Sequence, residues 1–156
     1  MKNIFMFILM VNLFCGFNLF SVDRVMVNED VSINEFNELL DAISFIESNN
    51  RNTVIGDNGK SVGRFQISKA YIDDVNRFLK NKKIRYSYED RNDPIKSREI
   101  VRVYLIEYGK HYSKVTGKIP SIEVYARIHN GGPSGWKKSA TNVYVKKIKS
   151  FIEKKV

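Results

Sequence analysis

Apolar residues recur with helical spacing between positions 36 and 46 of this 156-residue chain, and the run ends at an acid, Glu47. The apolar positions are adjacent or three residues apart, as on one face of an α-helix, and comprise Phe36, Leu39, Leu40, Ile43 and Ile46. Upstream, Ser32 and Glu35 have the spacing of a capping box, which starts a helix. The pattern predicts a buried helix that begins after Ser32 and ends near Glu47.

A small β-hairpin is expected after this helix. Asn58-Gly59 is a dipeptide that favours a tight turn, and strand-like stretches at 53–55 and 60–65 flank it. The short stretches leave room for a hairpin but not for a large sheet.

Cap residues and apolar spacing predict four more helices. These begin near Ser68, Asp93, Ser121 and Thr141. We expect the second of them to extend to about Tyr108, and the third to end at Gly131, where a glycine can adopt the left-handed conformation. The last should bury Tyr144, Ile148, Phe151 and Ile152. The predicted fold class is therefore α+β, mainly α, with about five helices and one hairpin.

Length and composition indicate one folded domain behind an export signal. A chain of 156 residues with 43% hydrophobic content fits a single core. Lys2 precedes an almost wholly apolar run from Ile4 to Phe20, and polar residues resume at Ser21, which is the layout of a signal peptide. We expect residues 1–21 to be a signal peptide and residues 22–156 to be the folded domain. The alternative is an uncleaved anchor, in which residues 4–20 tether the domain to a membrane.

The number and position of the cysteines indicate the cellular compartment. Cys15 is the only cysteine and lies within the expected signal peptide. An exported domain without disulfides must be stabilised by packing alone. We therefore expect an exported protein of a bacterial periplasm or cell envelope, or one secreted from the cell.

The formal net charge of +9 at pH 7 favours anionic partners, among them cell-wall polymers and membranes. We do not expect nucleic acid binding, because the basic residues are scattered among amphipathic helices and export separates the chain from nucleic acid. His111 and His129 are the only histidines and have no ligand-like spacing, so no metal or other cofactor is expected. We expect a monomer.

Glu47 is a candidate general acid because of its place at a predicted helix end. The last carbonyl groups of a helix carry negative partial charge, which disfavours ionisation of a nearby carboxyl group. Desolvation by apolar neighbours such as Phe45 and Ile46 acts in the same direction. A general acid must hold a proton that it can give to a leaving oxygen. The alternative interpretation is an ordinary solvated surface glutamate.

Asp57 lies at the predicted hairpin turn, where aspartate is favoured because its side chain binds nearby backbone amides. That role needs no chemistry. A hairpin that folds back beside the helix end would, however, bring Asp57 near Glu47. Two carboxylates are the usual apparatus of glycoside hydrolysis, about 5–5.5 Å apart for retention and about 6.5–9.5 Å apart for inversion.

A second stretch of interest is YARIHNGGPSGW, residues 125–136. The sequence from Asn130 to Pro133 breaks the preceding helix and leaves polar groups at a turn. The simpler interpretation is a helix stop. Trp136 is the only tryptophan, and either it stacks on a sugar or it is partly buried in the core.

Together these stretches resemble a known family. ARIHNGGPSGW…SATNVYVKKIK (126–149) is similar to the C-terminal signature of invertebrate-type lysozymes, the destabilase family, and GRFQISKAYIDD (63–74) resembles its Gly-x-x-Gln-Ile stretch. The ES…GRFQI core also resembles that of soluble lytic transglycosylases. The resemblance covers roughly residues 36–149 and implies a lysozyme-like fold. It also implies cleavage of the β-1,4 bond between N-acetylmuramic acid and N-acetylglucosamine in peptidoglycan.

The resemblance also implies roles for individual residues. Glu47 matches the general acid of both families, and Asp57 matches the second carboxylate of the invertebrate-type enzymes across a loop of different length. The remaining matches fall in stretches that line the sugar cleft, and they are Gln66, Ser68 and Tyr71 on one wall and His129 and Asn130 on the other. The chain departs from the invertebrate-type enzymes in lacking their many disulfides.

Three functions follow from this resemblance. The first is a muramidase that uses Glu47 and Asp57 to hydrolyse the glycan strand. The second is a lytic transglycosylase, in which Glu47 alone directs the 6-hydroxyl of muramic acid to form an anhydro end. The third is a cell-wall-binding module that has a cleft but no turnover.

Overall fold

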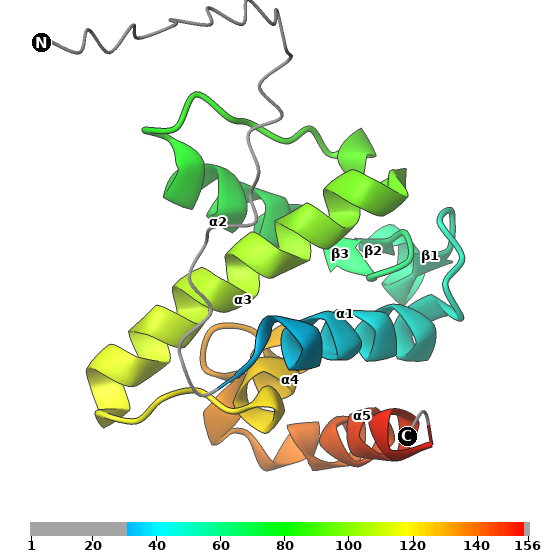
Figure 1. The fold of residues 1–156 in the computed structure, drawn as a ribbon. Coiled ribbons are helices and arrows are strands. Elements are labelled where there is room, and N and C mark those ends of the chain that lie inside the picture. Colours follow the sequence, from blue (N-terminus) through cyan, green and yellow to red (C-terminus); the bar gives the residue numbers. More distant parts are fainter. Residues whose placement is uncertain (1–30, 155–156) are drawn as a thin grey trace, which may run out of the picture.

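The computed structural model describes residues 31–154, and Figure 1 shows its helices and strands. The five α-helices are α1 (Ile33–Ser48), α2 (Lys69–Leu79), α3 (Pro94–Thr116), α4 (Ile122–Gly131) and α5 (Asn142–Glu153). The three short strands are β1 (Ile55–Gly56), β2 (Ser61–Val62) and β3 (Ile67–Ser68). Four short 3-10 helices link them, namely η2 (Asp57–Gly59), η3 (Glu89–Asn92), η4 (Gly135–Lys137) and η5 (Ser139–Thr141). The predicted signal peptide, residues 1–21, lies outside the described residues.

Helix α1 begins and ends where its sequence predicts. The Ser32 hydroxyl accepts from the backbone N–H of Glu35 at 3.1 Å, and the Glu35 carboxylate accepts from the backbone N–H of Ser32 at 2.8 Å. This reciprocal pair is the predicted capping box. At the other end Asn49 adopts a left-handed φ of 55° and closes the helix. Glu47 consequently lies in the last turn.

The hairpin prediction is incomplete, because the structure has a three-stranded antiparallel sheet in the order β1-β2-β3. Strands β1 and β2 pair around η2, with Ile55 opposite Val62. Strand β3 then folds back onto β2, with Ile67 opposite Val62. A two-residue strand is too short to show an alternating pattern, so β3 has no signature of its own in the sequence.

One helix end differs from expectation, and a second helix, α4, ends at Gly131 as predicted but is closed by a different glycine. Helix α3 extends to Thr116 rather than about Tyr108, and ends at Gly117, whose φ is 69°. Gly109 and the largely polar residues after it do not stop the helix, because an isolated glycine is tolerated inside a helix. After α4, the glycine with positive φ is Gly132, at 78°, and not Gly131.

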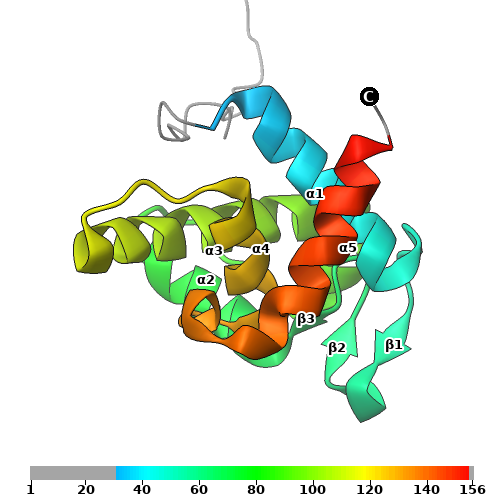
Figure 2. The ribbon, with the colours of Figure 1, turned by 90° about the horizontal axis from the view of Figure 1, so that it is seen from below.

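The core lies where the helices meet, and helix α4 contacts α1, α3 and α5 (Figure 2). The largest fully buried side chains include Phe36, Leu39, Leu40, Phe65, Ile72, Ile100, Leu105, Ile128 and Ile148. Tyr144 is buried in α5 as predicted, whereas Phe151 and Ile152 are only half-buried because α5 packs at the edge of the domain. Residues 31–154 contain no cysteine, so non-covalent contacts alone hold these elements together.

Among the helices within residues 31–154, none has both the length and the apolar content needed to cross a bilayer.

Gly63 provides a test of how the sheet is held against the η3 segment. A Cβ atom at Gly63 would overlap the backbone carbonyl oxygen of Arg91, whereas one at Gly59 would meet no atom within 4 Å. Both glycines have positive φ, 80° and 89°, so replacement by alanine strains the backbone at each position.

We expect Gly63→Ala to lower the free energy of unfolding by at least about 1 kcal/mol more than Gly59→Ala, because only the first adds a steric clash. Urea denaturation followed by far-ultraviolet circular dichroism measures both losses. Equal losses would show that the contact with Arg91 does not position the sheet.

Candidate active site

A single cleft of about 260 Å³ brings together residues from the helices and the sheet. All seven residues singled out in the sequence line it, and they are Glu47, Asp57, Gln66, Ser68, Tyr71, His129 and Asn130. Figure 1 shows the sheet beside the C-terminal end of α1, which carries Glu47. The cleft therefore opens where a helix end, a turn and the end of α4 meet.

Glu47 lies next to His129 in the cleft. The Nε2 atom of His129 lies 3.5 Å from Oε1 of Glu47, and the two side chains are 4% and 19% exposed. On the other side of the ring, Nδ1 of His129 lies 3.4 Å from the hydroxyl of Tyr71. The three side chains come from α4, α1 and α2, so packing among these helices holds the imidazole between a carboxyl group and a phenol.

Tyrosines surround this pair. Tyr71 stacks on Tyr104 with ring centroids 3.5 Å apart. The Tyr144 hydroxyl is buried close to Glu47 and makes no regular hydrogen bond within the described residues. Burial raises the pKa of both Tyr71 and Tyr144 well above the ordinary value, and the nearby charge of Glu47 raises each further. Both phenols therefore stay protonated at neutral pH, and each keeps a proton that it is able to donate.

Asp57 lies on the opposite wall, at the start of η2. The hydroxyl of Ser61 donates to its carboxylate at 2.6 Å. Asp57 is exposed and Ser61 is buried, so the sheet fixes an acid whose other oxygen remains open to the cleft. Asp57 thus lies at the turn between β1 and β2 and lines the same cleft as Glu47, and its carboxylate binds a side-chain hydroxyl where a backbone amide was expected.

Gln66 and Ser68 line the cleft and also form hydrogen bonds that stabilise the fold. The Gln66 amide donates to the carbonyl oxygens of Val54 and Gly63, at 3.1 and 2.8 Å. The Ser68 hydroxyl caps α2 by accepting from the N–H of Tyr71 at 3.2 Å. The Gln66 carbonyl and the Ser68 hydroxyl proton are the groups still able to meet a ligand. Asn130 is exposed at the end of α4.

Sequence reasoning missed several members of the site. Ser61, Tyr104 and Gly132 also line the cleft, and Tyr144 lies next to Glu47 behind it. Ser61 lies in the predicted hairpin, but nothing in the sequence shows that it binds Asp57. Tyr104 and Tyr144 fit helical apolar patterns, and those patterns account for burial without indicating a site.

No cluster of three or more histidine, cysteine, aspartate or glutamate side chains suited to a metal ion occurs within residues 31–154.

Comparison with known proteins identifies the family. The sequence matches the Destabilase family over residues 37–151. This chain belongs to the destabilase family. The match confirms the resemblance to this family, and the family is associated with lysozyme-like glycosidase activity in general.

A solved structure supports the same fold. The chain is similar to one chain of the crystal structure of Aeromonas hydrophila PliI in complex with Meretrix lusoria lysozyme, with 30% sequence identity and a TM-score of 0.59. The similarity covers 80% of this chain and 93% of that chain. Together with the family match it confirms a lysozyme-like fold that is α+β and mainly α. No curated protein matches the sequence.

The buried tyrosines predict that the fold weakens at alkaline pH. An unfolded tyrosine ionises near pH 10, whereas burial raises the pKa of Tyr144 well above this value in the folded chain. Above about pH 10 the folded state therefore binds more protons than the unfolded state, and stability falls as pH rises.

Tyr144→Phe should reduce this fall by up to about 1.4 kcal/mol per pH unit, the contribution of one proton. Urea denaturation at several values between pH 9 and pH 11.5 measures the slope for the parent and the variant. The same slope in both proteins would contradict the assignment.

Proposed function

We propose that this protein is a peptidoglycan muramidase that hydrolyses the β-1,4 bond between N-acetylmuramic acid and N-acetylglucosamine. The observation that carries the proposal is the placement of two acids in one cleft, Glu47 beside His129 and Asp57 anchored by Ser61. The destabilase family supports glycosidase chemistry in general. A peptidoglycan substrate would place the protein outside the cytoplasm, in agreement with the export expected from residues 1–21.

In the proposed mechanism Glu47 gives its proton to the glycosidic oxygen as the bond to the anomeric carbon breaks. His129 and the Tyr144 hydroxyl hold the Glu47 side chain and bind the negative charge that it gains. Asp57 approaches the opposite face of the sugar and stabilises the positive charge that develops on the anomeric carbon, either electrostatically or by bonding to it. Water completes the reaction, and Glu47 recovers a proton from it.

Glu47→Gln should retain the fold and lose wall-degrading activity by on the order of a thousandfold, because glutamine has no acidic proton to give. Glu38→Gln is the matched control, since Glu38 is an exposed glutamate of the same helix that does not line the cleft. Release of soluble fragments from purified peptidoglycan measures both variants. Activity near the parent level in Glu47→Gln would overturn the assignment.

The products and a second variant test the role of Asp57. Hydrolysis predicts reducing muramic acid ends by mass spectrometry and a large loss of activity in Asp57→Asn. Ser61→Ala should give a smaller loss in the same direction, because it removes only the hydrogen bond that holds Asp57. Anhydromuramic ends together with a modest effect of Asp57→Asn would instead indicate a lytic transglycosylase. Wall binding without any released product would indicate a binding module.

A further inference from the structure

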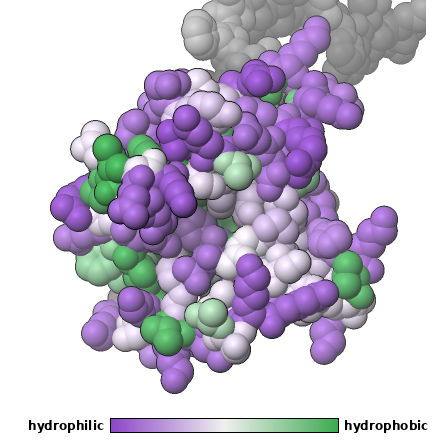
Figure 3. Space-filling view, turned by 180° about the vertical axis from the view of Figure 1, so that it is seen from behind, coloured by the Kyte–Doolittle hydropathy of each residue, from purple (hydrophilic) through white to green (hydrophobic). Residues whose placement is uncertain are grey.

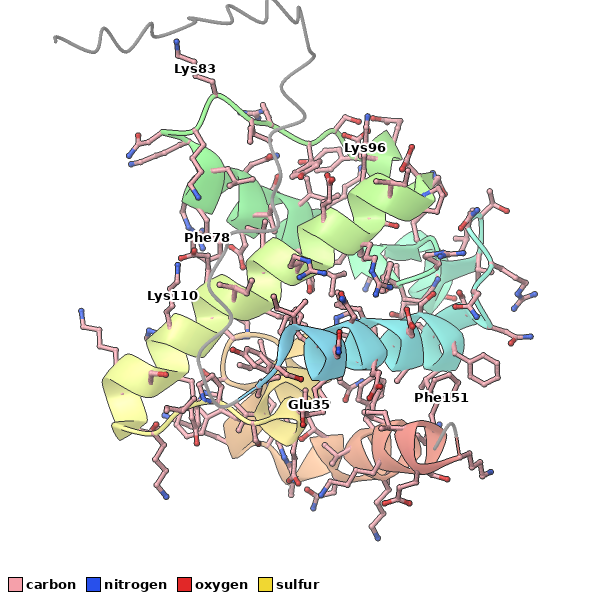
Figure 4. All side chains as sticks on the ribbon, viewed as in Figure 1. Glu35, Phe78, Lys83, Lys96, Lys110 and Phe151 are labelled. Carbon is pink, nitrogen blue, oxygen red and sulfur yellow. The ribbon has the colours of Figure 1, made fainter. Side chains whose placement is uncertain are left out.

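A second hollow lies outside the cleft, between the C-terminal part of α1 and one side of α5. We call it the α1–α5 groove, and its volume is about 730 Å³. Its apolar lining is Phe45, Ile46, Val143 and Phe151. Figure 4 shows Phe151 near the end of α5, on the side that faces α1, and the rings of Phe45 and Phe151 pack with centroids 4.9 Å apart.

The apolar lining of the groove is open to solvent. Phe45 is 43% exposed and Val143 is 65% exposed. Figure 3 shows the molecule from behind relative to Figure 1. Hydrophilic side chains cover most of that face, and hydrophobic side chains form only separate patches on it. Contiguous exposed apolar side chains with a polar rim are typical of an interaction surface.

Lysines form the rim of the groove. Lys146, Lys147 and Lys154 line it, and none of the described residues that line it is acidic. Within residues 31–154 none of these three lysines has an ion-pair partner within salt-bridge distance. The groove therefore combines exposed apolar side chains with unneutralised positive charge.

The other side of α5 has the opposite character. The hollow there is lined by Glu35, Glu38, Glu123 and Glu153, and its one lysine, Lys149, pairs with Glu123 at 2.7 Å. Helix α5 thus separates a basic side from an acidic side. An anionic partner would meet attraction at the α1–α5 groove and repulsion at the hollow beyond it.

We propose that the α1–α5 groove is a docking surface for anionic phospholipid bilayers. A bilayer surface offers negative headgroups for the three lysines and an apolar layer for Phe45 and Val143. A second copy of the chain suits the groove less well, because a symmetric contact would bring the lysines of both copies together. The groove and the cleft share no lining residue, so docking and cleavage are assigned to separate sets of side chains.

A local reporter in the full chain tests the proposal. Residues 4–20 are apolar enough in sequence to enter any bilayer, so overall vesicle binding is uninformative. In a Trp136→Phe background, which removes the only native tryptophan, Phe45→Trp places the reporter in the groove. Val143→Trp in the same background is a second reporter if the first disturbs the contact with Phe151. Ile95→Trp is the control, since Ile95 is 70% exposed on α3 and outside the groove.

With excess lipid, vesicles of phosphatidylcholine containing increasing fractions of phosphatidylglycerol should shift the groove reporter to shorter wavelength. Brominated lipid should quench it, while the Ile95→Trp reporter stays unchanged. Added salt should reverse the shift, because the Debye length is about 10 Å at 0.1 M. A shift that is equal in pure phosphatidylcholine, or equal at Ile95→Trp, would overturn the proposal.

Charge variants complete the test. Replacing Lys146, Lys147 and Lys154 by glutamine should weaken docking by roughly a hundredfold, since each lysine near an anionic surface contributes about fivefold. The matched control replaces Lys80, Lys82 and Lys83 by glutamine. These substitutions remove the same charge from exposed positions outside the groove. Equal losses in both triple variants would overturn the proposal.

Two further outcomes would also overturn the proposal. A groove reporter already at short wavelength without lipid would mean that another part of the chain covers the groove. If soluble polyglutamate shifted the emission of the groove reporter as much as anionic vesicles do, the groove would bind acidic peptides instead. Because Glu47→Gln affects turnover and not docking, failure of this proposal is distinguishable from failure of the proposed function.

Discussion

Packing of the apolar face of α1 against its neighbouring helices is the interaction on which the domain depends. No disulfide is available within residues 31–154, so the buried surface must supply the stability that disulfides provide in many small secreted domains. Phe36, Leu39, Leu40 and Ile43 are fully buried, and the same helix ends at Glu47 beside the cleft. Any shift of α1 in the core would therefore move the candidate acid as well.

The same packing explains how the polar groups of the site tolerate partial burial. A buried carboxyl or imidazole is costly unless other polar groups surround it. Glu47 contacts His129, and His129 contacts Tyr71, along one wall of the cleft. Each of the three comes from a different helix of the core. Asp57 depends on a different support, because Ser61 in the sheet holds it. The two acids of the cleft are thus positioned by two separate structural units, the helical core and the small sheet.

Helix α5 takes part in three surfaces at once. Its buried face carries Tyr144 next to Glu47, one side contributes to the basic α1–α5 groove, and the other contributes to the acidic hollow. Such a division is possible because neighbouring residues of a helix point in directions about 100° apart. A helix at the edge of a domain can therefore support a site inside the fold and present differently charged surfaces outside it.

The sequence by itself determined the helices and most of their ends, because caps and apolar spacing act between residues that are close along the chain. Ser32, Ser68, Asp93 and Ser121 all cap helices as expected. Only the tertiary structure decided that β3 joins the sheet, that Ser61 holds Asp57, and that His129 and Tyr144 meet Glu47. His129 and Tyr144 are far from Glu47 along the chain, and they meet it only because the helices pack together. Ser61 is close to Asp57 along the chain, and β3 is close to β2, but these contacts depend on the folded path of the backbone, which no residue pattern records. The family resemblance had pointed to His129 as a cleft residue, but the distance to Glu47 and the role of Tyr144 became visible only in the folded chain.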